Sequence, residues 1–139
     1  MSEERRHRFE DHTGEVRLVL SAPTLPELFL AAAEGLAELI SEDDRREVSS
    51  DEYETRVLRA RDRELLLVDF LNELIYLTET RHRVLTDVQI DELSPGILRF
   101  RVRGVPIRRP RTAVKAATLH GLTIEQSAAG LSASVVLDV

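Results

Sequence analysis

Residues 63–80 read RELLLVDFLNELIYLTET, and this stretch decides the fold. Its apolar residues cover most of the circumference of a helix, so we expect a helix that is largely buried. Asp62 stands before it in the position of an N-cap. A narrow polar stripe remains, formed by Asp69, Asn72, Glu73, Tyr76 and Thr80. Such a stripe is usually a solvated face, and a face that contacts a partner is the alternative.

A second amphipathic helix is predicted over residues 24–41. Thr24 and Glu27 form a capping box at its start. The apolar residues behind it share one helical face and are Leu25, Leu28, Phe29, Ala32, Leu36, Leu39 and Ile40. Outside the two helices apolar residues recur at every second position, which indicates strands. The predicted strands cover residues 16–21, 53–60, 84–93, 97–103, 118–126 and 131–139.

The order of these elements indicates the fold class. They follow one another as β-α-β-α-β-β-β-β, and the consecutive strands at the end favour antiparallel pairing over a doubly wound parallel sheet. We therefore expect an α+β fold in which two amphipathic helices pack with mostly antiparallel sheets. The chain has 139 residues and no internal repeat or linker, so residues 1–139 are expected to form a single domain.

The composition of the chain excludes several classes of function. The chain has no cysteine, which excludes disulfides, thiolate metal sites and cysteine nucleophiles and makes the cytoplasm the expected location. No stretch approaches the roughly 18 apolar residues of a membrane span, so no membrane association is expected. Phosphate-binding glycine loops, G-x-S-x-G elbows and H-E-x-x-H helices are also missing from the sequence. These observations favour a protein that is not an enzyme.

Charge is distributed unevenly along the chain. The net charge is −6, yet residues 99–115 contain seven basic residues and no acid. They are Arg99, Arg101, Arg103, Arg108, Arg109, Arg111 and Lys115. A segment of this kind suits phosphate groups, so one interpretation is a stand-alone RNA-binding module. The chain has four Phe, two Tyr and no Trp. It therefore has few of the aromatic side chains on which proteins that bind single-stranded nucleic acid stack the bases.

Three places carry residues suited to chemistry. Residues 11–15, DHTGE, are either a polar turn or a ligand site before an apolar strand. Asp138 and Val139 close the sequence with two carboxylates, which are either hard oxygen ligands or a solvated strand end. Lys115 is the only lysine beside 18 arginines. This exception suggests a position where a planar guanidinium cannot replace a compact ammonium.

These residues fall in blocks that resemble the archease family. Residues 11–16, DHTGEV, resemble its motif D/E-H-T-A-D-I/V, and residues 24–29, TLPELF, resemble its helix start TLEELF. Residues 65–76, LLLVDFLNELIY, are similar to LLVDWLNELLY, and residues 114–122, VKAATLHGL, to VKAVTYHGL. The final Asp-Val matches the family's terminal Asp-Ile or Asp-Val. The blocks follow the family's order across nearly the whole chain.

The resemblance implies an accessory protein. Archeases promote the guanylylation and multiple turnover of RtcB-type RNA ligases in tRNA splicing and RNA repair. These ligases take guanylate from GTP onto a histidine, with manganese, before they join RNA ends. The family is also linked to chaperone-like modulation of a tRNA methyltransferase. On this interpretation RNA is contacted only indirectly or weakly by the arginines of residues 99–111.

The resemblance also implies a divalent metal site, for which calcium is the expected ion. The family's ligand positions fall on Glu15, Asp138 and Val139, and Asp11 is an alternative ligand. Glu15 replaces the usual aspartate of the motif. The added methylene moves the carboxylate oxygens by roughly 1.5 Å, which a flexible calcium shell tolerates better than the strict octahedron of magnesium. Leu119 stands where the family usually has tyrosine.

Three further residues are expected to act on the ligase. The family's lysine corresponds to Lys115, and we expect His120 and His12 to lie with it on the face presented to the partner. A small metal-dependent hydrolase that uses Glu15, Asp138, His12 and His120 is a competing interpretation. No sequence motif supports that hydrolase.

Overall fold

The computed structural model describes residues 4–42 and 47–139. The three-stranded sheet contains β3 (Glu54–Arg59), β5 (Ile97–Pro106) and β4 (Arg83–Ser94) in that order. The five-stranded sheet contains β1 (Arg6–His12), β2 (Glu15–Ala22), β8 (Gly130–Asp138) and β6 (Ala116–Thr118) in that order, and β7 (Glu125–Ser127) also pairs with β8. The helices are α1 (Leu25–Ile40) and α2 (Arg63–Arg81). All strand pairs are antiparallel, so the predicted α+β class is confirmed.

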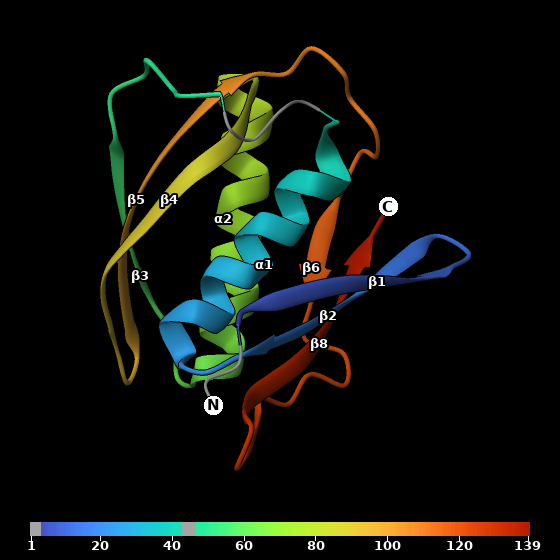
Figure 1. Cartoon of the computed structure of the whole chain (residues 1–139), viewed down its shortest axis with the longest axis vertical. Helices are drawn as coiled ribbons and strands as arrows, with labels where there is room; N and C mark the ends of the chain where they lie inside the picture. Colours follow the sequence, from blue (N-terminus) through green and yellow to red (C-terminus); the bar gives the residue numbers. More distant parts are fainter. Residues whose placement is uncertain (1–3, 43–46) are drawn as a thin grey trace.

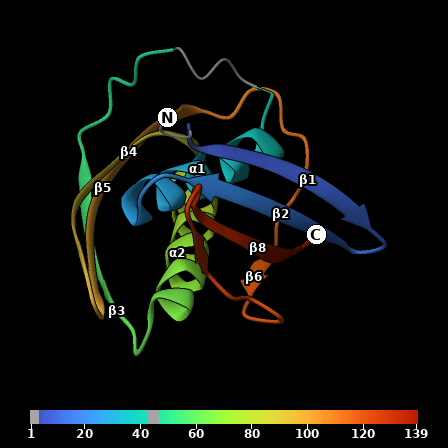
Figure 2. The ribbon, with the colours of Figure 1, turned by 60° about the horizontal axis from the view of Figure 1, so that its bottom comes forward.

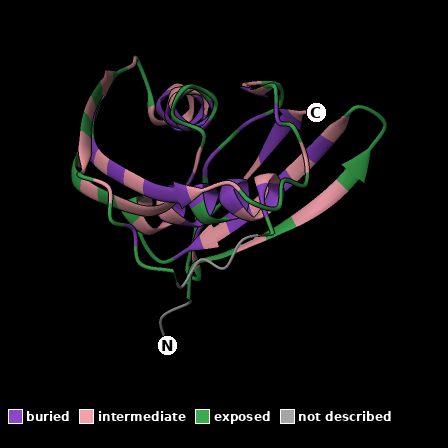
Figure 3. Cartoon of the chain, turned by 90° about the horizontal axis from the view of Figure 1, so that it is seen from above, coloured by how far each residue is buried: buried purple, intermediate pink, exposed green. Residues whose placement is uncertain are grey.

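Both helices lie between the two sheets (Figures 1 and 2). Three aromatic rings link these layers: Phe29 of α1 lies 5.4 Å from Phe70 of α2, which meets Phe100 of β5 edge-on at 5.0 Å. All three rings are fully buried. Figure 3 shows buried segments of the helices and of the strands in purple. One continuous core therefore holds both sheets to the helices. Neither helix of the described chain is long and apolar enough to cross a membrane.

Helix α1 begins where the capping box predicts. The Thr24 hydroxyl accepts a hydrogen bond from the Glu27 N–H. In the middle of the helix, Gly35 allows the five-stranded sheet to approach closely. A Cβ atom at this position would lie 2.7 Å from Cδ1 of Leu18 and 3.1 Å from the ring of His7. The glycine therefore sets the packing distance between α1 and strands β1 and β2.

The polar stripe of α2 is bonded to strands of both sheets. Asn72 forms hydrogen bonds with the backbone of Ala117 in β6. One residue further along the helix, Glu73 pairs with Arg56 of β3 at 3.2 Å. Tyr76 is half exposed. The stripe is therefore not a simple solvated face, because two of its members hold the edge strands of the two sheets.

Strand β1 was not predicted from the sequence. Its residues, RHRFEDH, include only one strongly apolar side chain, so the alternation that marks a half-buried strand is hidden. Pairing with β2 forms it, through a turn at Thr13 and Gly14 in which Gly14 has a φ of +75°. A turn therefore lies within residues 11–15, and it leaves both interpretations of this segment, a polar turn and a ligand site, open to test.

The predicted strand over residues 118–126 is wrong. The chain leaves the sheet after β6 and rejoins it at β7. Between them, buried Ile124 is held by side chains of α2: its N–H donates to Glu64, and its carbonyl accepts from Arg63, each at 3.0 Å. The apolar residues of this segment fill the core without a strand, which a period-two pattern does not distinguish.

The connection from β5 to β6 carries the chain from one sheet to the other. It crosses the C-terminal end of α1, where the N–H groups of Arg111 and Thr112 donate to the carbonyls of Ile40 and Leu39 at 2.8 and 3.1 Å. These bonds use carbonyls that the end of a helix leaves without partners. They fix the path that leads to Lys115.

Candidate metal and partner site

Glu15 and Asp138 occupy one cross-strand row of the five-stranded sheet. Glu15 of β2 pairs with His12 of β1 on one side and with Asp138 of β8 on the other, and Asp138 pairs with Ala116 of β6. Directly opposed residues of antiparallel strands point to the same face, with Cβ atoms about 5 Å apart. The neighbours Val16 and Leu137 are buried. The two carboxylates therefore lie together on the face away from the helices.

The backbone at this end of the sheet is fixed on both sides of β8. The N–H of Val139 donates to the carbonyl of Gly14 in the hairpin turn at 3.1 Å. The N–H of Lys115 donates to the carbonyl of Asp138 at 2.8 Å. Residues near the two ends of the sequence and from the segment before β6 thus meet at one place, where the backbones of Glu15, Asp138 and Lys115 lie side by side.

Lys115 is exposed and lies one residue before β6. Within residues 4–42 and 47–139, its ammonium group takes part in no ion pair. Its backbone is held to Asp138, whereas its side chain extends from an exposed position. The backbone of Lys115 therefore lies beside Asp138, and its exposed ammonium is not used in an ion pair within the described residues.

The structure separates the remaining candidates. His12 is exposed and shares the row of Glu15. Asp11 pairs with Val16 instead, which assigns it to the opposite face of the hairpin from Glu15. His120 is exposed in the turn after β6, two residues beyond its last paired residue. No hydrogen bond or ion pair joins His120 to the row within the described chain.

The donor chemistry of the row fits a hard divalent cation. Calcium takes six to eight oxygen ligands from carboxylates, carbonyls and water. Glu15 and Asp138 supply two carboxylates on one face, and Val139 lies beside them. No group of three or more His, Asp or Glu side chains that could hold a metal occurs in the described residues. A cation here would therefore need further oxygens from the backbone, including that of Val139, and from water.

Comparison with known proteins identifies the family. The sequence profile of the archease protein family matches residues 7–139. The chain belongs to the archease family. The protein archease of Methanosarcina acetivorans is 30% identical over 146 residues, and that of Methanosarcina mazei is 29% identical over 146 residues. Each alignment covers 99% of this chain and 99% of the relative.

Solved structures show the same archease fold. The solution structure of Methanobacterium thermoautotrophicum protein 1598 has a TM-score of 0.74 at 28% identity and covers 96% of this chain and 98% of that one. A crystal structure from Thermotoga maritima, described as an archease and possible chaperone, has a TM-score of 0.65 at 23% identity, with 94% of each chain covered. The second likeness concerns the fold alone.

The basic segment of this archease is largely neutralised by the fold. Five of its arginines lie next to carboxylates. The pairs are Arg99 with Glu92, Arg101 with Asp91, Arg103 with Asp87, Arg108 with Glu47 and Arg111 with Glu42. Tyr53 also packs its ring under two of these guanidinium groups. The excess of seven bases in the sequence therefore does not become a field of seven free cations.

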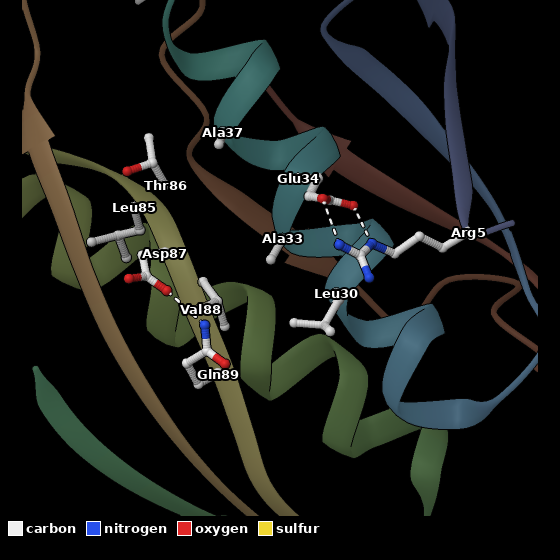
Figure 4. A pocket seen from close by; sticks show the side chains of 10 residues that line it. All are labelled: Arg5, Leu30, Ala33, Glu34, Ala37, Leu85, Thr86, Asp87, Val88 and Gln89. Atoms are coloured by element: carbon white, nitrogen blue, oxygen red, sulfur yellow. Dashed lines mark hydrogen bonds and ion pairs between the residues drawn. The ribbon is translucent and has the colours of Figure 1, made fainter. Parts of the chain in front are cut away.

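A groove on another side of the archease fold contains none of the candidate residues. It has a volume of about 330 Å³ and lies between α1 and β4 (Figure 4). Ala33 and Ala37 form part of its floor, and the guanidinium of Arg5 bonds Glu34 at its rim. Because its lining residues are distinct from the row, we do not assign this groove to the metal site.

The role of Asn72 was not predicted from the sequence. In the sequence Asn72 belongs to a polar stripe, whereas in the structure it is hydrogen-bonded to the strand that follows Lys115. The sequence does contain a hint of this role, because the Asn72 amide is flanked by Leu71 and Leu74, which are buried. A buried or half-buried amide needs hydrogen-bond partners, but the sequence does not reveal that β6 supplies them.

Proposed function

We propose that this archease promotes guanylylation and repeated turnover of an RtcB-type RNA ligase and does no covalent chemistry of its own. The ligase transfers guanylate from GTP to its own histidine and releases pyrophosphate. The archease supplies a preorganised surface at the Glu15–Asp138 row, next to Lys115. Its role is to favour the ligase state that accepts the nucleotide, which requires better binding to that state than to the others.

The observation that carries this proposal is the backbone arrangement around Asp138. This residue pairs with Glu15 on one side, and its carbonyl accepts the N–H of Lys115 on the other. The backbones that carry two acidic side chains and a lysine are thereby held together at one edge of the sheet. Sites built on paired strands hold their groups more accurately than sites on loops.

A divalent cation, with calcium as the proposed ion, would be held by Glu15, Asp138 and Val139. When bound, it would offset the repulsion between the two carboxylates and link β2 to the end of β8. The protein residues then do the remaining work. The backbone of Asp138 holds Lys115 in place, and His12 and His120 are proposed to contribute to the surface that meets the ligase.

Lys115 is proposed to reach a phosphate or carboxylate at the ligase surface. Its ammonium is a compact, strongly hydrated charge on a flexible stem, unlike the planar fork of arginine. Because no carboxylate of the described chain pairs with it, binding a partner does not first require breaking an internal ion pair. This difference gives a physical reason for a lone lysine in an arginine-rich chain.

The test of the proposed function compares ligation with and without the archease. Guanylylation of the cognate ligase and RNA joining are measured with the ligase at a lower and at a higher concentration than the RNA substrate. We expect the archease to increase guanylylation and to allow many turnovers per ligase. Unchanged guanylylation and unchanged turnover at all archease concentrations would rule out the proposal.

A stand-alone RNA-binding role is less well supported. Arg101 and Arg103 are bonded to Asp91 and Asp87, so contact with phosphates would have to displace these carboxylates. Filter binding of single-stranded RNA to the archease alone, over a range of salt concentrations, distinguishes the roles. Tight binding with a steep salt dependence would favour the RNA module. Binding only in the presence of ligase would favour the activator.

Modulation of a tRNA methyltransferase remains a second proposal, since the Thermotoga maritima protein is described as a possible chaperone. Its test is the aggregation of a cognate methyltransferase on heating, measured by light scattering. Protection by this archease at equimolar concentration would support the role, and protection no greater than that given by an unrelated protein would exclude it.

A further inference from the structure

The side-chain amide of Asn72 takes the place of a neighbouring strand beside β6. Its Nδ2 donates to the Ala117 carbonyl at 3.1 Å, and its Oδ1 accepts the Ala117 N–H at 2.8 Å. Strand β6 is three residues long and pairs with β8 on one side only. An amide carries both a donor and an acceptor, as a peptide group does, so one side chain satisfies both free backbone groups.

We propose that Asn72 is a positioning residue that sets Lys115 against the Glu15–Asp138 row. The effect passes through three consecutive residues of one backbone. Ala117 is bonded to Asn72, Ala116 pairs with Asp138, and the N–H of Lys115 donates to the Asp138 carbonyl. The consequence for the ligase rests on the proposed function, whereas the positioning itself does not.

The position of Asn72 on a rigid helix makes this anchor effective. Its neighbours Leu71 and Leu74 are buried in the core, so α2 cannot shift to follow a loose strand. Within the described residues, Asn72 is the only side chain that forms hydrogen bonds with the backbone of β6. The hydroxyl of Thr118 is buried and has no hydrogen-bond partner within the described residues, so it adds no second polar anchor.

Neither leucine nor an ionised aspartate at this position can form both hydrogen bonds with Ala117. Leucine has a similar size but leaves the Ala117 N–H and carbonyl without partners. Aspartate keeps the acceptor, but its second oxygen, when ionised, faces the Ala117 carbonyl and repels it. A protonated carboxyl group restores the pattern, because its O–H can donate to that carbonyl. Asn72→Asp is therefore a conservative variant whose function depends on pH.

The test begins without the ligase. Amide hydrogen exchange is measured for Ala117 and Lys115 in the wild type, Asn72→Leu and Asn72→Asp. The Ala60 N–H, which donates to the carbonyl of Gly96 at the end of the three-stranded sheet, serves as an internal reference. The variant Glu73→Gln is the matched control, since it alters the adjacent residue, which bonds to the other sheet.

In Asn72→Leu we expect protection of both Ala117 and Lys115 to fall about tenfold, the effect of losing bonds of ordinary strength, while Ala60 is unchanged. Asn72→Asp should lose protection at neutral pH and regain it in acid, at a pH above the ordinary aspartate pKa of about 3.9, because repulsion by the Ala117 carbonyl favours the protonated carboxyl group. Glu73→Gln should leave both amides protected. Unchanged protection of Lys115 in Asn72→Leu would overturn the positioning role, and so would an equal loss at Ala60.

Ligase assays then separate the two claims. If the wild type stimulates guanylylation, Asn72→Leu should reduce that stimulation at least about fivefold, with the calcium affinity of the Glu15–Asp138 row changed less than about twofold. Full stimulation by Asn72→Leu would overturn the functional consequence of the inference. If even the wild type gives no stimulation, the proposed function fails, and the exchange data alone decide whether Asn72 positions Lys115.

Discussion

Glu15 and Asp138 face each other across neighbouring antiparallel strands near the two ends of the sequence. Their Cβ atoms begin about 5 Å apart on one face, so two negative charges are kept close by the register of the sheet. A sheet that served only as a scaffold would gain from an opposite charge at one of these positions. The pair therefore favours a bound cation, and this relationship underlies the predictions about the site.

Calcium should stabilise the wild type through this pair. The double variant Glu15→Gln with Asp138→Asn should lose the effect, because its amides no longer attract the ion. For one site at a calcium concentration 100 times the dissociation constant, the expected gain is about 2.7 kcal/mol in the wild type. Thermal unfolding with calcium and with a chelator measures it. An equal calcium-dependent shift in both proteins would place the site elsewhere.

Glu15→Asp should bind calcium more tightly than the wild type. The shorter side chain has the length typical of the family. Its carboxylate oxygens return to the usual position, from which the extra methylene of Glu15 moves them by roughly 1.5 Å. We expect the dissociation constant, measured by titration calorimetry, to fall several-fold. The matched control is Glu10→Asp, a residue of β1 bonded to Arg8. Weaker binding by Glu15→Asp would show that the glutamate is adapted to this site.

Lys115→Arg should impair ligase stimulation although it keeps the charge. The side chain is exposed, so the free energy of unfolding should change by no more than about 0.5 kcal/mol. The rate of ligase guanylylation should fall at least about tenfold if a compact ammonium is required. The reverse exchange in the same basic segment, Arg99→Lys, should have little effect. Equal rates for the wild type and Lys115→Arg would remove the special role of the lysine.

The stability of the protein should respond to pH through Asp69. Burial raises the pKa of this carboxyl group, so it holds its proton more tightly in the folded chain than in the unfolded chain. Its favourable contribution is full below the ordinary pKa of about 3.9 and is lost as pH rises through the folded value. Asp69→Asn should therefore be more stable than the wild type at neutral pH, by roughly 0.5 kcal/mol.

Denaturant unfolding of both proteins across this pH range measures the difference. It should disappear in acid, below about pH 4, where the wild-type carboxyl group is protonated. A wild type that is more stable than Asp69→Asn at neutral pH would mean that the ionised carboxylate has a favourable partner in the folded protein.

Gly35→Ala should destabilise the fold although alanine favours helices. The new Cβ would lie 2.7 Å from Cδ1 of Leu18, which is fully buried and cannot move freely. Overpacking of this kind costs about 1–3 kcal/mol, more than the helical gain of roughly 1 kcal/mol. Chemical denaturation measures the change. Ala33→Gly in the same helix is a control that loses helix propensity without adding a clash.

The sequence predicted the elements with strong local patterns. Both helices were located within about two residues, since their apolar faces and the Thr24 and Asp62 caps act within a few residues. The meeting of Glu15, Asp138 and Lys115 came from the family resemblance, and strand pairing brings their backbones together. Neither composition nor periodicity fixes which strands become neighbours.

Features that depend on partners outside the segment itself were not predicted. Strand β1 forms because β2 offers an edge, and its own charged sequence gives little sign of it. The link between Asn72 and Ala117 joins a helix to a strand far along the chain. The same holds for the basic segment, whose apparent charge is largely neutralised when arginines such as Arg101 and Arg103 pair with carboxylates of β4. Local patterns carry no information about such contacts.

The most direct measurement is the rate of guanylylation of the cognate ligase in a single turnover, with calcium or with a chelator. The wild-type archease is compared with the double variant Glu15→Ala and Asp138→Ala, after both are shown to be folded. We predict that the wild type stimulates ligase guanylylation in a calcium-dependent way and that the double variant does not. Equal stimulation by the two proteins, with or without calcium, would contradict this prediction.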